Sequence, residues 1–147
     1  MNSNVVKAGA GNSFPFGEDL VTIKVSASDT NGTHSLMEWV VAEDVQPIAH
    51  FHEDYEETFY LLSGSLEFTL DQETFTASTG DFVRVPAGTR HAFANCSNEK
   101  VKMLVGFTPG GMEHFFEKYQ NTGDDFDLEG YLSEAKSLHK TVYEVGS

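Results

Sequence analysis

Residues 48–57 read Ile-Ala-His-Phe-His-Glu-Asp-Tyr-Glu-Glu, and this stretch decides how the rest of the chain is interpreted. Side chains of a β-strand alternate between its two faces, so His50 and His52 point the same way, a short distance apart. Glu57 opens the next strand-like run. If its face is the interior one, Glu57 lies beside the two histidines, while Glu56 points away. Two imidazoles and one carboxylate in this arrangement can hold a divalent ion.

A third imidazole follows a tight turn further along the chain. Residues 80–95 read GDFVRVPAGTRHAFAN, and the turn at Pro86 and Gly88 would aim His91 back into the molecule. A single histidine in a strand is more often a surface residue or a hydrogen-bonded core residue than a ligand. Three imidazoles with one carboxylate, however, form a mixed nitrogen and oxygen set that suits a borderline transition metal and leaves coordination positions open. Only a fold can bring the four together.

The spacing of these residues resembles the first cupin motif, G(X)5HXH(X)3–4E(X)6G. His50, His52, Glu57 and Gly64 fit it, with four residues before the glutamate and six after it. One position departs from the pattern, because Asp44 stands where the leading glycine would fall. That position shapes a turn and supplies no ligand, so the departure leaves the metal set intact.

The second cupin motif, G(X)5PXG(X)2H(X)3N, is matched at every position. The matching residues are Gly80, Pro86, Gly88, His91 and Asn95. The resemblance covers roughly residues 34–107 and implies a double-stranded β-helix barrel (a jelly-roll barrel) with one metal at its centre. By this resemblance His50, His52, Glu57 and His91 are the metal ligands. The metal would be one divalent transition ion, namely iron, nickel, cobalt, manganese, copper or zinc.

The pattern along the chain predicts an all-β domain followed by two short helices. Short runs rich in Val, Phe, Thr and Leu are separated by turn signals, and they predict strands at 20–25, 35–41, 58–62, 66–70, 74–77, 82–85, 91–94 and 101–107. After residue 111 the apolar spacing changes to that of helices. Their apolar faces would be formed by Met112, Phe115, Phe116 and Tyr119, and by Leu128, Tyr131, Leu132, Ala135 and Leu138. We therefore expect an N-terminal arm at 1–19 that could end in an added strand, a barrel at 20–108, and at 109–147 a helical extension packed on the barrel.

A barrel of this size has room for one ligand cavity. Inward-facing apolar and aromatic side chains would form its walls, and such a wall above a metal suits an aromatic or polyketide-like ligand. The candidates for the substrate pocket are Met37, Trp39, Phe59, Phe68, Phe82, Phe93 and Met103, with Leu61 and Val105 as further inward residues. His34, His114 and His139 are expected to be surface residues.

The segments at 35–41 and 108–116 resemble the single-domain cupins similar to quercetin 2,3-dioxygenase. That resemblance implies a metal-dependent dioxygenase acting on an enolic or aromatic, flavonol-like or polyketide-like molecule, with Glu57 as the general base. Two alternatives use the same ligands. One is a redox-neutral cyclase or isomerase of a polyketide or sugar-like compound, and the other is a cupin that binds a small molecule without turnover.

Composition excludes several partners. The 147 residues carry 23 Asp and Glu against nine Lys and Arg, a formal net charge of −14, which disfavours nucleic acid and anionic membranes. An acidic rim would also disfavour anionic substrates, so the expected partner is a neutral aromatic small molecule. The single cysteine, Cys96, can form no intrachain disulfide, and no leader-like or membrane-length apolar run is present, so we expect a cytoplasmic protein. The family resemblance implies a homodimer.

Overall fold

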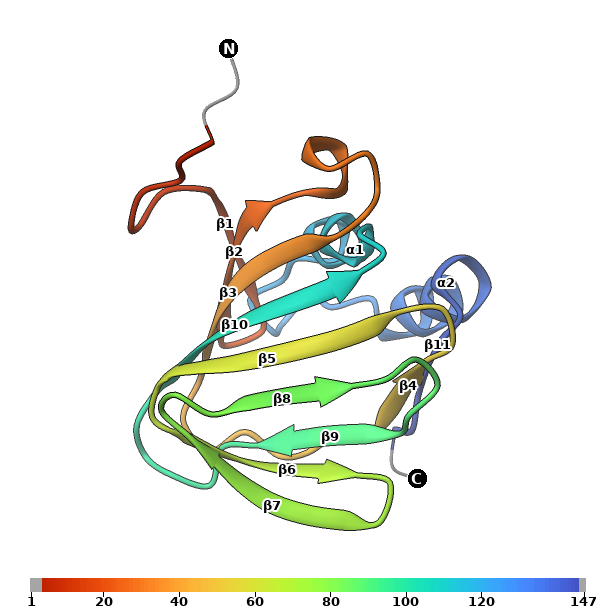
Figure 1. The fold of residues 1–147 in the computed structure, drawn as a ribbon. Helices are drawn as coiled ribbons and strands as arrows, with labels where there is room; N and C mark the ends of the chain where they lie inside the picture. The colour runs from red at the N-terminus through yellow and green to blue at the C-terminus, as the bar shows by residue number, and fades with distance from the viewer. Residues whose placement is uncertain (1–3, 146–147) are drawn as a thin grey trace.

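The computed structural model describes residues 4–145, and these form two antiparallel sheets that face each other (Figure 1). Along the first sheet the strands follow the order β1 (Asn12–Phe16), β2 (Asp19–Val25), β3 (Ser35–Val41), β10 (Val101–Thr108), β5 (Glu56–Ser63) and β8 (Phe82–Val85). The second sheet has the order β11 (Thr141–Tyr143), β4 (His50–His52), β9 (His91–Ala94), β6 (Ser65–Leu70) and β7 (Glu73–Ser78). The all-β, jelly-roll prediction is confirmed.

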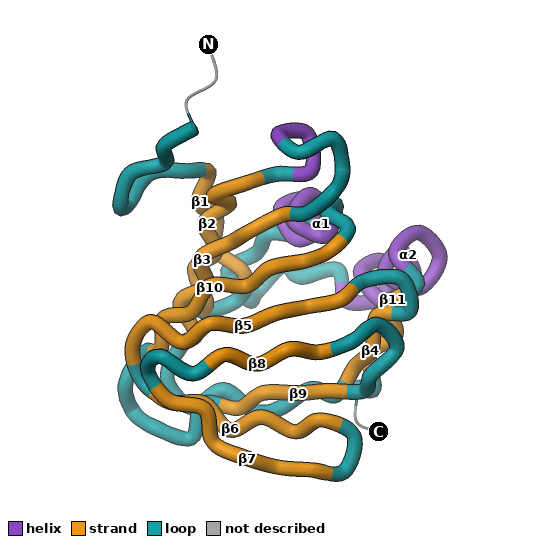
Figure 2. The backbone as a smooth tube through the Cα atoms, viewed as in Figure 1, coloured by secondary structure: helices purple, strands orange, loops and turns teal. Residues whose placement is uncertain are grey.

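The helices lie beside the sheets, and a short 3-10 helix, η1 (Ala27–Asp29), follows β2. Helix α1 (Met112–Lys118) packs against β3, and α2 (Leu128–His139) leads directly into β11 (Figures 1 and 2). Both helices begin where the apolar spacing predicts. Of the expected apolar face of α2, Tyr131 and Ala135 are buried, but Leu128 and Leu138 are exposed. No helix within residues 4–145 has the length and apolar character needed to cross a bilayer.

The alternation of side chains along each strand determines which residues face the interior. In β5, Glu57, Phe59 and Leu61 are buried, while Tyr60 is exposed, as the two-residue period predicts. Across the sheet, Phe59 pairs with Val105 and Leu61 pairs with Met103. The interior face of β5 therefore carries a carboxylate at one end and core side chains along the rest, and this places Glu57 at the edge of the hydrophobic core.

Glycine and its substitutes form the turns that the motifs require. Gly64 has a φ of 91° in the β5–β6 hairpin, and a Cβ there would come within 2.9 Å of the Val101 side chain. Asp44, which replaces the glycine of the first motif, adopts a φ of 55°, a left-handed conformation that aspartate tolerates better than most residues. The departure from the motif therefore preserves the turn.

Two side chains lie deeper than their residue types suggest. Glu113 is an acid on a helix, yet it is fully buried and accepts backbone hydrogen bonds from Ala27 at 2.7 Å and Gly111 at 2.8 Å. His139 was expected at the surface, but it is only partly exposed, since its ring packs against Phe115. Strand β11 was not predicted at all.

Candidate metal centre

Three strands bring the four predicted ligands together. His50 and His52 extend from the same face of β4, His50 pairs with His91 at the start of β9, and Glu57 comes from β5. One ligand atom from each of the four side chains lies within 4.8 Å of every other. All but His50 are buried, and His50 is partly so. The sequence motifs thus meet in one cluster.

The turn between β8 and β9 fixes His91. Gly88 has a φ of 81°, and its backbone N–H donates to the carbonyl oxygen of His52 at 2.7 Å. The backbone of the second motif is thereby bonded to the backbone of the first. Because His91 begins the strand that follows, its position relative to His52 depends on this turn.

Glu57 contacts two of the three histidines of the cluster. Its Oε1 atom lies 3.1 Å from His52 Nε2 and 2.9 Å from His91 Nε2. Burial by itself would raise the pKa of Glu57, but the contacts with the two histidines outweigh it and hold that pKa well below its ordinary value. Glu57 is therefore ionised at neutral pH. Its other oxygen, Oε2, makes no hydrogen bond to any residue within 4–145.

The outer nitrogens of the three histidines are each held by an oxygen. His50 Nδ1 lies 3.0 Å from the carbonyl of Ile48, and His91 Nδ1 lies 2.9 Å from the carbonyl of Thr89. A carbonyl only accepts, so each Nδ1 carries the hydrogen. For His52 the partner is the Thr141 hydroxyl at 2.8 Å, which itself donates to the carbonyl of residue 139 and so accepts from the imidazole.

This arrangement fits a metal. With Nδ1 protonated on every ring, the neutral Nε2 atoms present lone pairs to the centre, which is the tautomer a metal ligand needs. Two such lone pairs facing one carboxylate oxygen repel it unless a positive charge, either a proton or a cation, lies between them. Burial, together with the neighbouring His91 and His52, lowers the pKa of His50 to about 3, so this ring is neutral and free to coordinate.

The pKa of His91 shifts in the opposite direction to that of His50. Burial would lower its pKa, but the hydrogen bond and charge of Glu57 outweigh this and raise it. A protonated His91 would supply the positive charge in the absence of a metal, and a divalent cation would supply it when bound. The donor set, three imidazole nitrogens and one carboxylate, is therefore able to hold a transition ion with positions left open.

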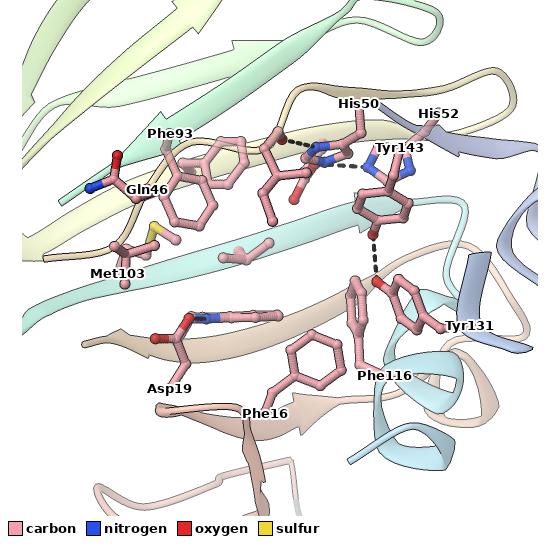
Figure 3. Close-up of a pocket in the computed structure, with 16 residues that line it drawn as sticks. Phe16, Asp19, Gln46, His50, His52, Phe93, Met103, Phe116, Tyr131 and Tyr143 are labelled. Atoms are coloured by element: carbon pink, nitrogen blue, oxygen red, sulfur yellow. Dashed lines mark hydrogen bonds and ion pairs between the residues drawn. The ribbon is translucent and has the colours of Figure 1, made fainter. Parts of the chain in front are cut away.

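A cavity of about 170 Å³ opens from the cluster into the space between the sheets (Figure 3). Four of the expected pocket residues line it, namely Trp39, Phe59, Phe93 and Met103. Its other walls come from Phe16, Asp19, Val45, Gln46, Ile48, Val105, Phe116, Tyr131 and Tyr143, together with His50, His52 and Glu57.

Three expected pocket residues lie elsewhere. Met37 and Phe68 are completely buried in the core and do not reach the cavity. Phe82 is 61% exposed on the outer face of β8, because Val83 and Val85 take the inner face of that strand. The assignment of Phe82 to the pocket is wrong, since Phe82 shares its face of the strand with the charged, exposed Arg84.

Residues from the two ends of the chain complete the site. Tyr143 of β11 stacks on His50, with ring centres 4.8 Å apart and an interplanar angle of 20°. Near the other end, Asp19 accepts hydrogen bonds from Trp39 Nε1 at 2.9 Å and from the Ala42 N–H at 2.8 Å. Burial raises the pKa of Asp19, and these hydrogen bonds oppose the rise. No motif marks these residues, although the alternating run at 141–143 was a weak strand signal.

Fold and cluster together define a class: a double-stranded β-helix barrel with a three-histidine, one-glutamate cluster beside its cavity. A family model described as a cupin domain matches residues 35–107, the part that holds all four clustered residues. This chain belongs to the cupin superfamily.

Comparison with known proteins agrees with that assignment. Quercetin 2,3-dioxygenase of Bacillus subtilis (strain 168) is 30% identical over 138 residues, which cover 90% of this chain but only 39% of that protein. Among solved structures, a predicted oxalate decarboxylase from Thermotoga maritima has a TM-score of 0.65 at 17% identity, covering 71% of this chain and 98% of that one. The polyketide cyclase RemF from Streptomyces resistomycificus has a TM-score of 0.60 at 23% identity, covering 74% and 80%. The two structural likenesses support the fold alone.

Proposed function

We propose that this chain is a metal-dependent dioxygenase of a small enolic or aromatic molecule. The observation that carries the proposal is the set of three Nε2 atoms and the Glu57 carboxylate, oriented by fixed outer hydrogen bonds at the base of an aromatic cavity. The similarity to quercetin 2,3-dioxygenase supports the same class of reaction.

His50, His52, His91 and Glu57 would hold the metal. When bound, it supplies Lewis acidity, which lowers the pKa of a substrate hydroxyl, and a redox-active ion also permits reaction with dioxygen. Glu57 accepts the proton of that hydroxyl at Oε2, the oxygen that its histidine contacts leave unused. The aromatic walls exclude water and hold the ring against the ligand face.

A redox-neutral cyclase or isomerase is the second candidate. The same Glu57 would move a proton between two positions of the substrate, with no oxygen consumed. The supporting observation is that this reaction needs only the same donor set and the unused Oε2 atom of Glu57.

An oxygen electrode separates the two candidates. We would screen enolic and flavonol-like aromatics with protein loaded in turn with iron, nickel, cobalt, manganese, copper and zinc. We expect oxygen uptake with a redox-active metal. We expect no uptake with zinc, and none in a His50→Ala, His52→Ala variant. Turnover that proceeds equally well with zinc under nitrogen would favour the redox-neutral reaction and overturn the dioxygenase.

A substitution at Glu57 tests whether this residue is the general base. Glu57→Gln keeps an oxygen donor for the metal but cannot accept a proton, so we expect metal uptake to persist in part while turnover falls by about 100-fold or more. Undiminished turnover in metal-loaded Glu57→Gln protein would show that another group is the base.

A further inference from the structure

The cavity beside the cluster has the size of a single ring. A buried apolar cavity of about 150 Å³ holds one benzene molecule, and the cavity here is about 170 Å³. A three-ring flavonol would have to project through the mouth. The space between the aromatic walls is therefore matched to a substrate whose reacting part is one six-membered ring.

Two phenol groups meet at the wall of this cavity (Figure 3). The hydroxyl oxygens of Tyr131, from α2, and Tyr143, from β11, are 2.6 Å apart. Tyr131 is only 5% exposed, and its ring also packs against the ring of Tyr143. Both residues lie outside the segment matched by the cupin model, so the pair is a feature that the motifs do not include.

Counting hydrogens leaves one donor unused. Each phenol carries one O–H, and a single bond between the two oxygens uses only one of the two hydrogens. Within residues 4–145 neither hydroxyl has any other hydrogen-bond partner. A buried donor without an acceptor is costly, so the remaining O–H needs an oxygen, and a ligand in the cavity can supply it.

We propose that Tyr131 and Tyr143 form a substrate-positioning hydrogen-bond donor, and that the site takes a single-ring molecule bearing two oxygens. One oxygen of the ring faces the three histidines and Glu57, while the other accepts the free phenolic hydrogen. Tyr143 stacks on His50 with ring centres 4.8 Å apart, so the phenol pair lies directly beside the cluster, within reach of a second oxygen on the same ring. This inference rests on the proposed metal-dependent function.

The test uses catechol and phenol as probes of zinc-loaded protein. The two molecules differ by one oxygen. Trp39 is the only tryptophan of the chain and lines the cavity, so its fluorescence reports binding, with titration calorimetry as an independent readout. In Tyr131→Phe, Tyr143→Phe double-variant protein we expect catechol to bind about five- to tenfold more weakly, phenol within twofold of the wild type, and zinc stoichiometry to be unchanged.

The controls isolate the hydroxyls. Tyr60→Phe makes the same chemical change on an exposed strand face and should bind both probes as the wild type does. The two single variants each retain one hydroxyl with its hydrogen unused, so they should lose less catechol affinity than the double variant. They also keep the test valid if the double variant does not fold.

Three outcomes would contradict the inference in different ways. Equal catechol affinity in the wild-type and zinc-loaded double variant would overturn the positioning role. Equal weakening of catechol and phenol would show that the hydroxyls support packing and do not recognise a second oxygen. A wild-type protein that takes up no zinc would instead overturn the proposed function, and the zinc measurement separates this failure from the other two.

Discussion

Thr141 sets the hydrogen position on one imidazole of the cluster. Its hydroxyl donates to the carbonyl of residue 139, which leaves its oxygen to accept from His52 Nδ1. The His52 Nε2 lone pair then faces the centre. A side chain 89 residues away thus decides whether His52 can act as a ligand. Outer partners of this kind commonly change metal affinity by about 10- to 100-fold when removed.

Replacing the hydroxyl should therefore weaken metal binding without unfolding the barrel. In Thr141→Val protein, His52 Nδ1 loses its acceptor and the ring gains freedom to move its hydrogen to Nε2. We expect zinc affinity, measured by competition with a chromophoric chelator, to fall by about tenfold or more.

Two variants bracket this prediction. Thr141→Ser retains the hydroxyl and should stay within a few-fold of the wild type, while Thr76→Val changes an exposed threonine of β7 and should have no effect. Zinc affinity equal in Thr141→Val and wild-type protein would mean that Thr141 does not control the tautomer.

At the scale of elements, the motifs and the two-residue alternation predicted most strands to within two residues. Strands β3, β8 and β9 have the expected bounds, and both helices start where the apolar period changes. The elements that were missed or left open are the ones that depend on tertiary contacts. Strand β1 contains Pro15, which an edge strand tolerates, and β11 has three residues stabilised by pairing with β4.

The candidate site shows the same division. The four residues of the cluster were named from the resemblance to the two cupin motifs, and the structure brings them together. The cavity wall has no such motif, because Trp39, Phe93 and Tyr143 meet there only after the two sheets pack. Phe82 was misplaced because its aromatic character was given more weight than the alternation, which puts it on the same face as Arg84.

Glu113 connects two elements that lie far apart in the chain. It is buried at the start of α1, and its carboxylate accepts the backbone N–H groups of Ala27, in η1, and Gly111. Burial would raise its pKa, but these hydrogen bonds outweigh burial and lower it below the ordinary value of 4.5. A lowered folded-state pKa means that the carboxylate stabilises the fold above about pH 4.5 and that this contribution is lost as pH falls through the folded pKa.

Glu113→Gln should therefore destabilise the protein at neutral pH and matter less in acid. We expect the free energy of unfolding in urea to fall by about 1–3 kcal/mol at pH 7, since hydrogen bonds to a charged acceptor are replaced by one amide oxygen. The difference from wild type should shrink below pH 4. Glu73→Gln, at an exposed position of β7, is the control and should be neutral. A loss that is the same at both pH values would mean that ionisation of Glu113 is irrelevant.

At the scale of the whole molecule, the charge of −14 affects what can approach the cavity. Of the acids near the cluster, Glu53 and Asp54 remain exposed, whereas Glu57 faces the histidines. A field of one sign attracts cations and repels anions over a distance set by salt. We therefore expect the site to prefer neutral ligands, and that preference should depend on ionic strength.

Catechol and 3,4-dihydroxybenzoate test this field, because they share a ring and differ by one carboxylate. The carboxylated probe should bind zinc-loaded protein more weakly at about 0.01 M salt, and the gap should narrow at about 1 M, where the screening length falls from about 30 Å to about 3 Å. Catechol affinity should change little over the same range. A gap that does not respond to salt would assign the discrimination to shape.

Metal binding should also stabilise the whole barrel, because the cluster joins β4, β5 and β9 from both sheets. A ligand that binds only the folded state adds about 2.7 kcal/mol at a concentration of 100 times its Kd. For a chain of this length that corresponds to a rise in Tm of about 5–10 °C. Removing the metal with a chelator should lower the Tm of zinc-loaded protein by this amount, and restoring zinc should reverse the change.

The His50→Ala, His52→Ala variant distinguishes this linkage from a general effect of the chelator. Both replaced side chains belong to the cluster, and β4 keeps its backbone pairing with β9 and β11, so the variant should fold and show a Tm that neither zinc nor chelator alters. The wild-type protein without metal should in turn be held by a protonated His91 against Glu57, an arrangement that the variant retains. A chelator-dependent Tm of the same size in both proteins would place the stabilising ion elsewhere.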